Sequence, residues 1–407
     1  MPRGVKVNRF HLHKSVVSVL FMLVNAFLWF YLISNVLIDF SEEYELNRMV
    51  LFSLHSFGAI IGEVAALPLS KFHYKTLIFW TLLGAFASLL PLLHLSSLYI
   101  QIICFIWGFS FGLGLPLCLS YFARKTTFEN RGRLSGAIFL LSFFGTSLFV
   151  NLSYMLKTSP LLFLFLCLWR LSGILPLVFI MGEQKIFKKN VVTSKGPPAM
   201  YTGVLYLYFT PWLIFNIVDG LEGTLLRDFV KAAFPGHYAT LQTLYSILLA
   251  IWAILGGFLC DLIGRKPSTI LGFTAMGIAY AIISMVPKVL FAWFFFYICD
   301  SVSWGLLITI FIPLIWGDLS RKDLEEKCYL IGTIPFFLSA IVQNFFADYM
   351  KFLSEANAFS LAALFLFLAI VPLLFAPETL PERVLKERDL RSYIERAKRI
   401  REKFTKG

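Results

Sequence analysis

Three carboxylates lie inside long apolar runs of this sequence, where an ionised group is costly. Asp300 lies near the centre of one run, and Asp219 and Glu222 lie one helical turn apart in another. A charged side chain at the centre of a bilayer costs on the order of 2.5–3.5 kcal/mol even on the lenient insertion scale. A carboxylate that takes up and releases a proton there can couple the movement of a solute to a proton gradient. Asp300 is therefore our first candidate for such a site, and a permanently paired carboxylate, for example against Arg170, is the alternative.

Other polar and aromatic residues in the apolar runs complete the candidate binding site. Tyr297 and Trp304 share a helix face with Asp300, at spacings of three and four residues. Arg170 keeps its proton in proteins, so it either contacts an anionic group or forms a structural ion pair, and we favour the structural role. The remaining candidates for contact with a solute are Asn216, Asn25, Trp29 and Ser110.

Metal or nucleophile chemistry is not indicated by the sequence. The 6 cysteines form no CxxC pair and lie in or beside apolar segments, so we expect buried thiols, no metal and no cofactor. The letters GxSxG occur at Gly108–Gly112, but inside a continuous apolar run rather than at a strand-to-helix turn. Close contact between helices is the better interpretation of this pattern, and an integral-membrane enzyme is retained only as an alternative.

The composition excludes an ordinary soluble domain and predicts the elements that must position these residues. Hydrophobic residues make up 58% and charged residues 15% of the 407 residues, whereas soluble domains carry about 25% charged residues. A membrane span needs about 20 mostly apolar residues, and no cleavable signal peptide is evident. The sequence predicts an all-α integral membrane protein with twelve transmembrane helices. They lie near 15–39, 48–69, 76–94, 96–122, 134–156, 160–182, 204–227, 238–260, 268–286, 288–316, 328–350 and 358–376.

The distribution of Lys and Arg predicts that both termini are cytoplasmic. With the N-terminus inside, most of the 36 basic residues fall on the inner loops and tails, as the positive-inside rule requires. The outer loops hold only Arg48, Lys157, Arg227, Lys231, Lys288 and Lys351. The net charge of +12 then follows from topology and from anionic lipid. We expect a multi-pass protein of the cell membrane that binds no nucleic acid.

The sequence contains an internal repeat. Glu129–Gly136 after the fourth apolar run corresponds to Glu325–Gly332 after the tenth, with an offset of 196 residues (332 − 136) between the two glycines. Two six-helix halves related in this way are typical of one large class of transporters. The predicted units are an N-terminal six-helix bundle at 1–183, a cytoplasmic linker at 184–203, a C-terminal bundle at 204–379 and a basic cytoplasmic tail helix at 380–407.

The loop after the eighth apolar run resembles a signature of the major facilitator superfamily, GxxxDxxGR[RK]. The matching residues are Gly257, Asp261, Gly264, Arg265 and Lys266. Arg131–Arg133 resembles the family's RG motif after the fourth helix, and Pro377–Thr379 resembles its PET motif after the twelfth. The equivalent loop of the first half departs from the pattern, because Ser70 stands where the family has aspartate. The sequence also lacks the Gly-Pro motif of drug–proton antiporters and the PESPR-like ending of sugar porters, so no subfamily is assigned.

The resemblance implies a contact between the two bundles on the cytoplasmic side. In this family, loop residues of this kind hold one half against the other, so Asp261 is expected to face the start of the fifth helix, where Arg131 and Arg133 lie. An aspartate beside a helix N-terminus is stabilised by about 0.3–1 kcal/mol, or more if partly buried. We hypothesise a charge-paired inner gate that holds the outward-open state. The alternative is that these charges only set the topology.

A second contact, with the signs reversed, is implied by pseudo-symmetry. The bases Lys71 and Lys75 would face Glu325 and Glu326 beside the start of the eleventh helix. In the family fold, helices one, four, seven and ten also line a central cavity, and the candidate solute-binding residues fall mostly on those helices. The resemblance therefore places the binding site between the bundles and the gate below it.

The predicted function is secondary active transport of a small solute by alternating access, coupled to protons. The expected partners are a small-molecule substrate, the lipid bilayer and protons, and the chain is expected to be a monomer. The excess of acids over bases at the candidate site favours cationic, zwitterionic or neutral solutes. The alternatives are a transport-inactive sensor or assembly protein on the same fold, and an integral-membrane enzyme.

Overall fold

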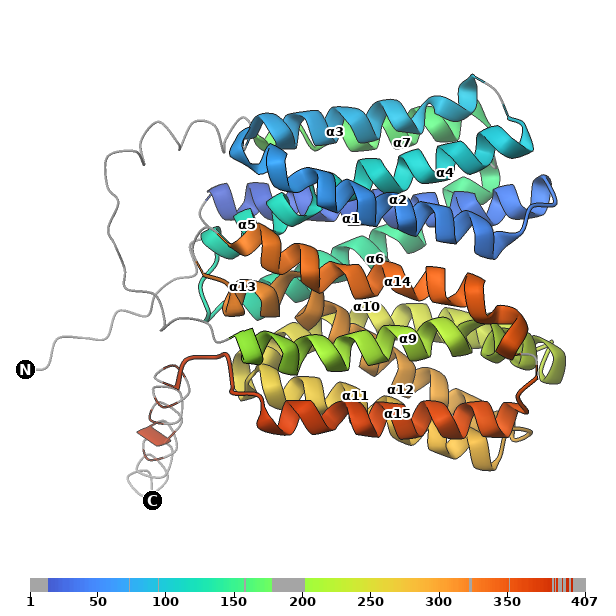
Figure 1. Ribbon diagram of the computed structural model, residues 1–407, viewed down its shortest axis with the longest axis vertical. Helices are drawn as coiled ribbons and strands as arrows, with labels where there is room; N and C mark the ends of the chain where they lie inside the picture. The colour runs from blue at the N-terminus through green and yellow to red at the C-terminus, as the bar shows by residue number, and fades with distance from the viewer. Residues whose placement is uncertain are drawn as a thin grey trace, which may run out of the picture.

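The structure, a computed structural model, describes residues 14–72, 74–93, 95–156, 159–177, 202–321, 324–350 and 352–382, with isolated positions up to 397. These residues form helices and no strands (Figure 1). The N-terminal half contains α1 (Lys14–Glu43), α2 (Arg48–Leu69), α3 (Tyr74–Ser88), α4 (Ser97–Gly112), α5 (Leu115–Lys125), α6 (Arg131–Leu156) and α7 (Pro160–Ser172), with the 3₁₀ turns η1 (Ser70–Phe72) and η2 (Leu90–Leu92). The C-terminal half contains α9 (Thr202–Ala233), α10 (Tyr238–Ile263), α11 (Arg265–Met285), α12 (Leu290–Thr309), the π-helical turn η3 (Ile310–Leu314), α13 (Ile315–Leu319), α14 (Glu325–Met350) and α15 (Glu355–Phe375).

The described residues contain 12 helical segments that are long and apolar enough to cross a membrane, so the predicted all-α fold with twelve spans is confirmed. Two of these spans are interrupted. Between α4 and α5 the helix breaks at Gly114, with Pro116 in the first turn of α5. Between α12 and α13 it loosens into η3, which contains Pro313, as expected because proline removes a backbone donor and crowds the preceding turn. Gly114 and the first residue of η3 lie 196 residues apart (310 − 114), the same offset as the sequence repeat.

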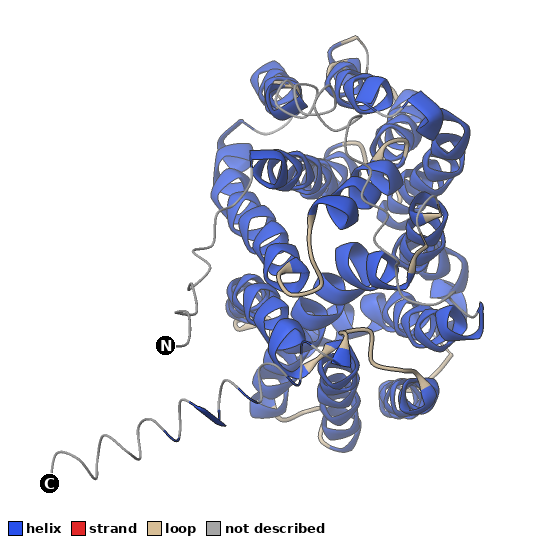
Figure 2. Ribbon diagram, turned by 90° about the vertical axis from the view of Figure 1, so that its left-hand side faces the viewer, coloured by secondary structure: helices blue, strands red, loops and turns tan. Residues whose placement is uncertain are grey.

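The helices lie side by side in two groups (Figure 1). α1 begins and α15 ends at the left-hand side of Figure 1, which we call the terminal end, and Figure 2 looks along the helices from that end. Between the halves, α6 packs against α10, and α14 packs against α2 and α5. The predicted linker at 184–203 and the predicted tail helix at 380–407 lie largely outside the described residues. Within the tail, Lys386 pairs with Glu382 at 2.7 Å.

Glycines allow α2 and α4 to pack with their backbones in contact, as the sequence predicts for Gly108 and Gly112. A Cβ atom at Gly108 would overlap the carbonyl oxygen of His55, and one at Gly112 would overlap that of Ala59. A Cβ atom at Gly58 on α2 would likewise overlap the carbonyl oxygen of Phe105 on α4. Small residues permit such close approach in membrane proteins, where helix association depends on van der Waals contact.

We predict that Gly108→Ala destabilises the protein, by about 1–3 kcal/mol as for other overpacked cores, because a methyl group there would meet main-chain atoms that cannot rotate away. The thermal unfolding midpoint in detergent measures this effect. Gly272→Ala is the matched control, because its Cβ would meet only side-chain atoms of Leu307 and Leu306, the closest at 3.0 Å. Equal midpoints for the two variants would contradict the prediction.

Candidate functional site

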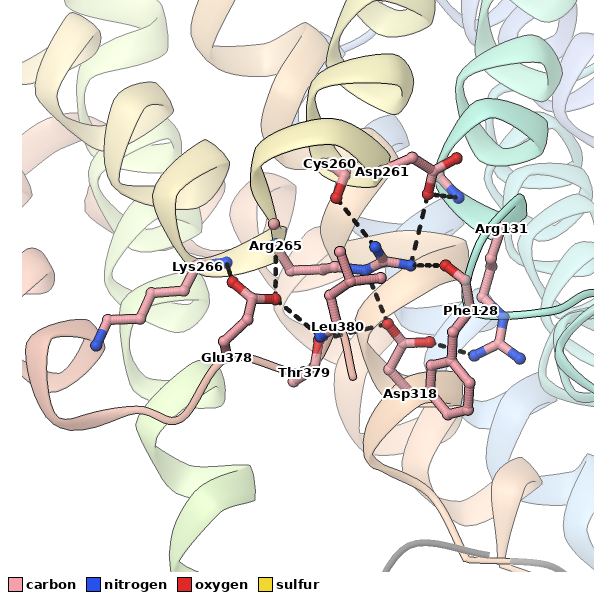
Figure 3. Close-up of polar contacts among 12 residues, drawn as sticks. Phe128, Arg131, Cys260, Asp261, Arg265, Lys266, Asp318, Glu378, Thr379 and Leu380 are labelled. Atoms are coloured by element: carbon pink, nitrogen blue, oxygen red, sulfur yellow. Dashed lines mark hydrogen bonds and ion pairs between the residues drawn. The ribbon is translucent and has the colours of Figure 1, made fainter. Parts of the chain in front are cut away.

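A buried carboxylate joins the two halves at the terminal end. Asp318 on α13 accepts a hydrogen bond from Nη1 of Arg131, at the start of α6, and another from Nε of Arg265 at 3.0 Å (Figure 3). The side chains of Asp318 and Arg265 are fully buried, and that of Arg131 is 5% exposed. Arg265 also donates to the carbonyl oxygen of Phe128 in the N-terminal half. Separating the halves here would take Arg131 away from Asp318 and the Phe128 carbonyl away from Arg265, and breaking a buried pair costs several kcal/mol.

Asp261 forms the second contact, and its expected position beside the start of the fifth span is confirmed. Its carboxylate accepts hydrogen bonds from the backbone N–H groups of Gly132 and Arg133, both at 3.0 Å, and from Nε of Arg133 at 3.1 Å. Of the two expected arginines, Arg131 turns instead to Asp318. Free N–H groups and the helix dipole make a helix N-terminus a favourable partner for a carboxylate. The approach needs glycine, because a Cβ at Gly257 would overlap the carbonyl oxygen of Gly132.

The residues of the PET motif hold the start of α11 in place within the C-terminal half. Glu378 accepts hydrogen bonds from the backbone N–H groups of Arg265 at 2.8 Å and Lys266 at 3.0 Å. Gly264 precedes them at φ 107°, where a side chain is strained, and a Cβ there would also meet the Glu378 carboxylate. These contacts fix the backbone of Gly264, Arg265 and Lys266, and the Arg265 side chain then points toward Asp318 (Figure 3).

The third contact differs from the one expected. Glu325 and Glu326, in the first turn of α14, pair with Nη2 of Arg124 at 3.2 and 2.8 Å. The expected partners, Lys71 and Lys75, are exposed, and among the described residues neither forms an ion pair. The predicted lysine–glutamate contact is therefore wrong. Arg124 replaces the lysines because α5 continues to the terminal end directly beside α14, and all three contacts thus set bases of the N-terminal half against acids of the C-terminal half.

We predict that Asp318→Asn weakens the closure of the terminal end, because Arg131 and Arg265 lose their shared counter-charge. Breaking a buried pair costs on the order of 3–5 kcal/mol. The measurement is the distance between spin labels on cysteines introduced at Lys75 and Leu262, exposed positions on α3 and α10, after removal of the native cysteines. The labels should move apart in Asp318→Asn and not in Glu129→Gln, which removes an exposed acid at the same end. Unchanged distances would show that Asp318 does not hold the halves together.

A cavity of about 320 Å³ extends from the opposite end toward the middle of the C-terminal half. It begins among residues at the first turns of α2 and α10, and it reaches Asp219 on α9 and Asp300 and Trp304 on α12. This volume lies at the lower end of the 300–1,000 Å³ typical of small-molecule sites. The structure thus combines a cavity toward one end with a charged seal at the other.

Four of the predicted solute-binding residues line this cavity together: Asp219, Asp300, Tyr297 and Trp304. Oδ2 of Asp219 accepts a hydrogen bond from Ser339 at 2.8 Å, while Oδ1 of Asp300 is buried without a hydrogen-bond partner among the described residues. Gln242 donates to the hydroxyl of Tyr297 at 3.2 Å. The other six predicted residues, Glu222, Asn216, Asn25, Trp29, Ser110 and Arg170, are not among those that line it.

These six are held in contacts inside their own halves or buried beside the cavity. Ser110 donates to the carbonyl oxygen of Trp107, and Asn216 to that of Trp212, each within its own helix. Glu222 is 4% exposed, and one of its carboxylate oxygens lacks a hydrogen-bond partner among the described residues. No group of three or more potential metal ligands occurs in the described part of the chain.

Arg170 lies in the core of the N-terminal half and does not pair with Asp300. Its Nη1 donates to Oδ1 of Asn25 at 2.8 Å, and its guanidinium lies 4.2 Å from the centroid of a Trp80 ring and 5.7 Å from that of Trp29. Trp29 in turn donates to Ser88 at 2.8 Å. The positive charge is thus met by tryptophan faces and an amide oxygen, and not by the carboxylate of the expected structural ion pair. Nε and Nη2 of Arg170 are buried without a hydrogen-bond partner among the described residues.

We predict that Arg170→Lys lowers stability, because lysine lacks the planar group that stacks on Trp80 and reaches Asn25. A cation–π contact of this kind contributes roughly 0.5–2 kcal/mol. Unfolding midpoints of Arg170→Lys, Trp80→Leu and the double variant form the test. The double variant should lose less than the sum of the single changes. Strict additivity would mean that the contact contributes nothing.

The sequence alone did not identify Asp318, Arg124, Arg48 or Arg227 as site residues. Asp318 follows the tenth apolar run and has no counterpart in the repeat, since Phe122 stands 196 residues earlier. The only feature that marks it in the sequence is an acidic residue among the bases of the predicted inner side. Arg48 and Arg227 are recognisable as bases of the predicted outer side, but only the structure brings them to the same cavity.

Comparison with solved structures identifies the fold. The chain matches the proton:xylose symporter XylE bound to 6-bromo-6-deoxy-D-glucose, described as a major facilitator superfamily protein, with a TM-score of 0.68 and 15% identity over 90% of this chain and 96% of that one. A XylE variant with two tryptophan substitutions matches with a TM-score of 0.69 and 14% identity, over 92% of this chain and 98% of that one. The human organic anion transporter MFSD10 matches with a TM-score of 0.65 and 14% identity, over 88% of this chain and 99% of that one. No protein-family profile and no curated protein matches the sequence. The resemblance seen in the loop signature is thus confirmed at the level of the fold.

Proposed function

We propose that this chain, which has the fold of the major facilitator superfamily, is a secondary active transporter of a small solute coupled to protons. The observation that carries the proposal is the pairing of a sealed terminal end with a cavity toward the opposite end. The seal consists of Asp318, Asp261 and the Glu325–Glu326 pair. The cavity contains Asp219 and Asp300 at its inner part. A site that is accessible from one side only is what alternating access requires.

The terminal end is the cytoplasmic end in this proposal, and the structure then represents an outward-facing conformation. The bias of Lys and Arg toward this end supports the orientation. Opening to the cytoplasm requires α6 to leave α10, and α5 and α2 to leave α14. The ion pairs at the terminal end break in that step and hold the outward-facing state until it occurs.

Asp300 is the group that takes up and releases the proton. It lies within a membrane-spanning helix, and among the described residues its Oδ1 has no hydrogen-bond partner, so no base fixes its charge. The charged and titratable residues that line the cavity with it are Asp219, Arg48, Arg227, Tyr238, Tyr245, Tyr280 and Tyr297. A solute that displaces the proton, or that enters with it, is thereby coupled to the proton gradient.

The test is transport by the purified protein in proteoliposomes. A defined mixture of amino acids, sugars and organic acids is supplied with an imposed proton gradient, internal pH is followed with a dye, and the vesicle contents are identified by mass spectrometry. Wild-type protein should accumulate at least one solute together with a pH change. Asp300→Asn should abolish accumulation driven by the gradient, and Glu355→Gln, at an exposed position at the start of α15, should not.

The same measurement separates the alternatives. An integral-membrane enzyme would convert a compound of the mixture into another, and a sensor would bind without flux or conversion. The solved neighbours are transporters, which favours transport over catalysis. Accumulation that is unaffected by Asp300→Asn would contradict the assignment of the proton-binding group.

A further inference from the structure

The charges of the cavity are separated along its length. Its inner part holds the carboxylates of Asp219 and Asp300, and its outer part holds the guanidinium groups of Arg48 and Arg227. Asp219 and Arg227 lie eight residues apart on α9, which corresponds to about 12 Å along a helix axis. The cavity therefore has acidic groups at its inner part and basic groups at its mouth.

Aromatic rings surround the inner carboxylates. Tyr245 from α10, Tyr280 from α11, and Phe296, Tyr297 and Trp304 from α12 line the cavity with Asp219 and Asp300. An ammonium group is attracted both by carboxylates and by ring faces, and this attraction strengthens when water is excluded. Oδ1 of Asp300 is an acceptor that no described residue occupies. The inner part of the cavity is thus built for a positively charged nitrogen.

The outer guanidinium groups are suited to an anionic group. Arg48 is half-buried, with its guanidinium 5.5 Å from the ring centroid of Phe52, and it forms no ion pair within the described part of the chain. Arg227 forms an ion pair with the exposed Asp228, with Nε 3.2 Å from Oδ1. Guanidinium groups bind carboxylates and phosphates through paired donors. Arg48 therefore offers a cation that no acid among the described residues pairs with directly.

We propose, on the basis of the proposed function, that the transported solute is a zwitterion with an ammonium group and a carboxylate. Its ammonium group lies between Asp219 and Asp300, and its carboxylate lies on Arg48 and Arg227. A simple cation is repelled at the mouth, a simple anion is repelled at the inner part, and a neutral solute leaves the desolvated charges without partners.

Such a solute contacts both halves of the protein. Arg48 and the neighbouring Met49 and Phe52 come from α2, while the carboxylates and the aromatic rings around them come from the C-terminal half. Binding of both charged groups therefore draws α2 toward α9 and α12 across the mouth of the cavity. The same contacts that select the solute then favour closure of the outward-facing side.

The test uses the purified full-length protein and two matched sets of probes. The first set is 4-aminobutanoate, butylamine and butanoate, and the second is phenylalanine, phenethylamine and 3-phenylpropanoate. Binding is measured by calorimetry. At least one zwitterion should bind about tenfold or more tightly than its amine and its acid, since each lost charge-assisted contact is worth that factor or more.

Variants assign the two ends of the solute. Arg48→Gln should reduce the affinity for the zwitterion to that for the amine, and Arg48→Lys should restore part of the difference. Asp300→Asn should weaken binding of both zwitterion and amine. Lys231→Gln is the control, because Lys231 is a base near the same end of α9 that faces the ring of Tyr238, at 5.0 Å, and does not line the cavity. Unfolding midpoints without ligand verify that each variant is folded.

Three results would overturn the inference: an amine or acid that binds as tightly as its zwitterion, an Arg48→Gln protein with unchanged affinity for the zwitterion, or no binding by either zwitterion. Flux of the same six probes into proteoliposomes separates this inference from the proposed function. Flux of amines or acids without zwitterions contradicts the inference and leaves transport intact. Zwitterion binding without flux of any solute contradicts transport and leaves the assignment of the cavity intact.

Discussion

The charged seal around Asp318 is the interaction on which the arrangement of the two halves depends. Its carboxylate lies between Arg131 of one half and Arg265 of the other, and all three side chains are excluded from solvent. In such surroundings each charge is stable only while its partners are present. Removal of one half would expose all of them together, so intermediate separations are disfavoured.

The close approach of helix backbones makes the seal possible. At the α6–α10 contact, Gly132, Gly136 and Gly257 have no room for side chains, and this brings the N–H groups of α6 within reach of Asp261. The seal is therefore formed by the backbone of one half as well as by side chains. The backbone N–H donors at a helix N-terminus are already fixed in position, so binding the carboxylate there does not require a donor side chain to be ordered.

The two halves share a fold and differ in chemistry. The cavity is lined mainly by the C-terminal half, with Arg48, Met49 and Phe52 as the contribution of the N-terminal half. In the N-terminal half, Arg170 donates from Nη1 to Asn25 and stacks on Trp80, while its Nε and Nη2 are buried without a hydrogen-bond partner among the described residues. Neither Asn25 nor Arg170 is among the residues that line the cavity. The pseudo-symmetric architecture thus contains an asymmetric cavity, which is lined mainly by one half and to which the other half contributes residues at the mouth.

The sequence by itself determined the twelve spans and the repeat offset, and the contact of Asp261 with the start of α6 followed from the resemblance of its loop to the family signature. Hydrophobic runs and local motifs are properties of short segments, so they can be recognised without knowledge of neighbours. The partners of Asp318 and of the Glu325–Glu326 pair were decided only by the tertiary structure, because Arg131 and Arg124 lie 187 and about 200 residues away from them in sequence. The same holds for the cavity: Asp219, Asp300 and Arg48 come together through the rotation of each helix about its axis. That rotation is set by close contacts between many helices, and no single segment encodes it.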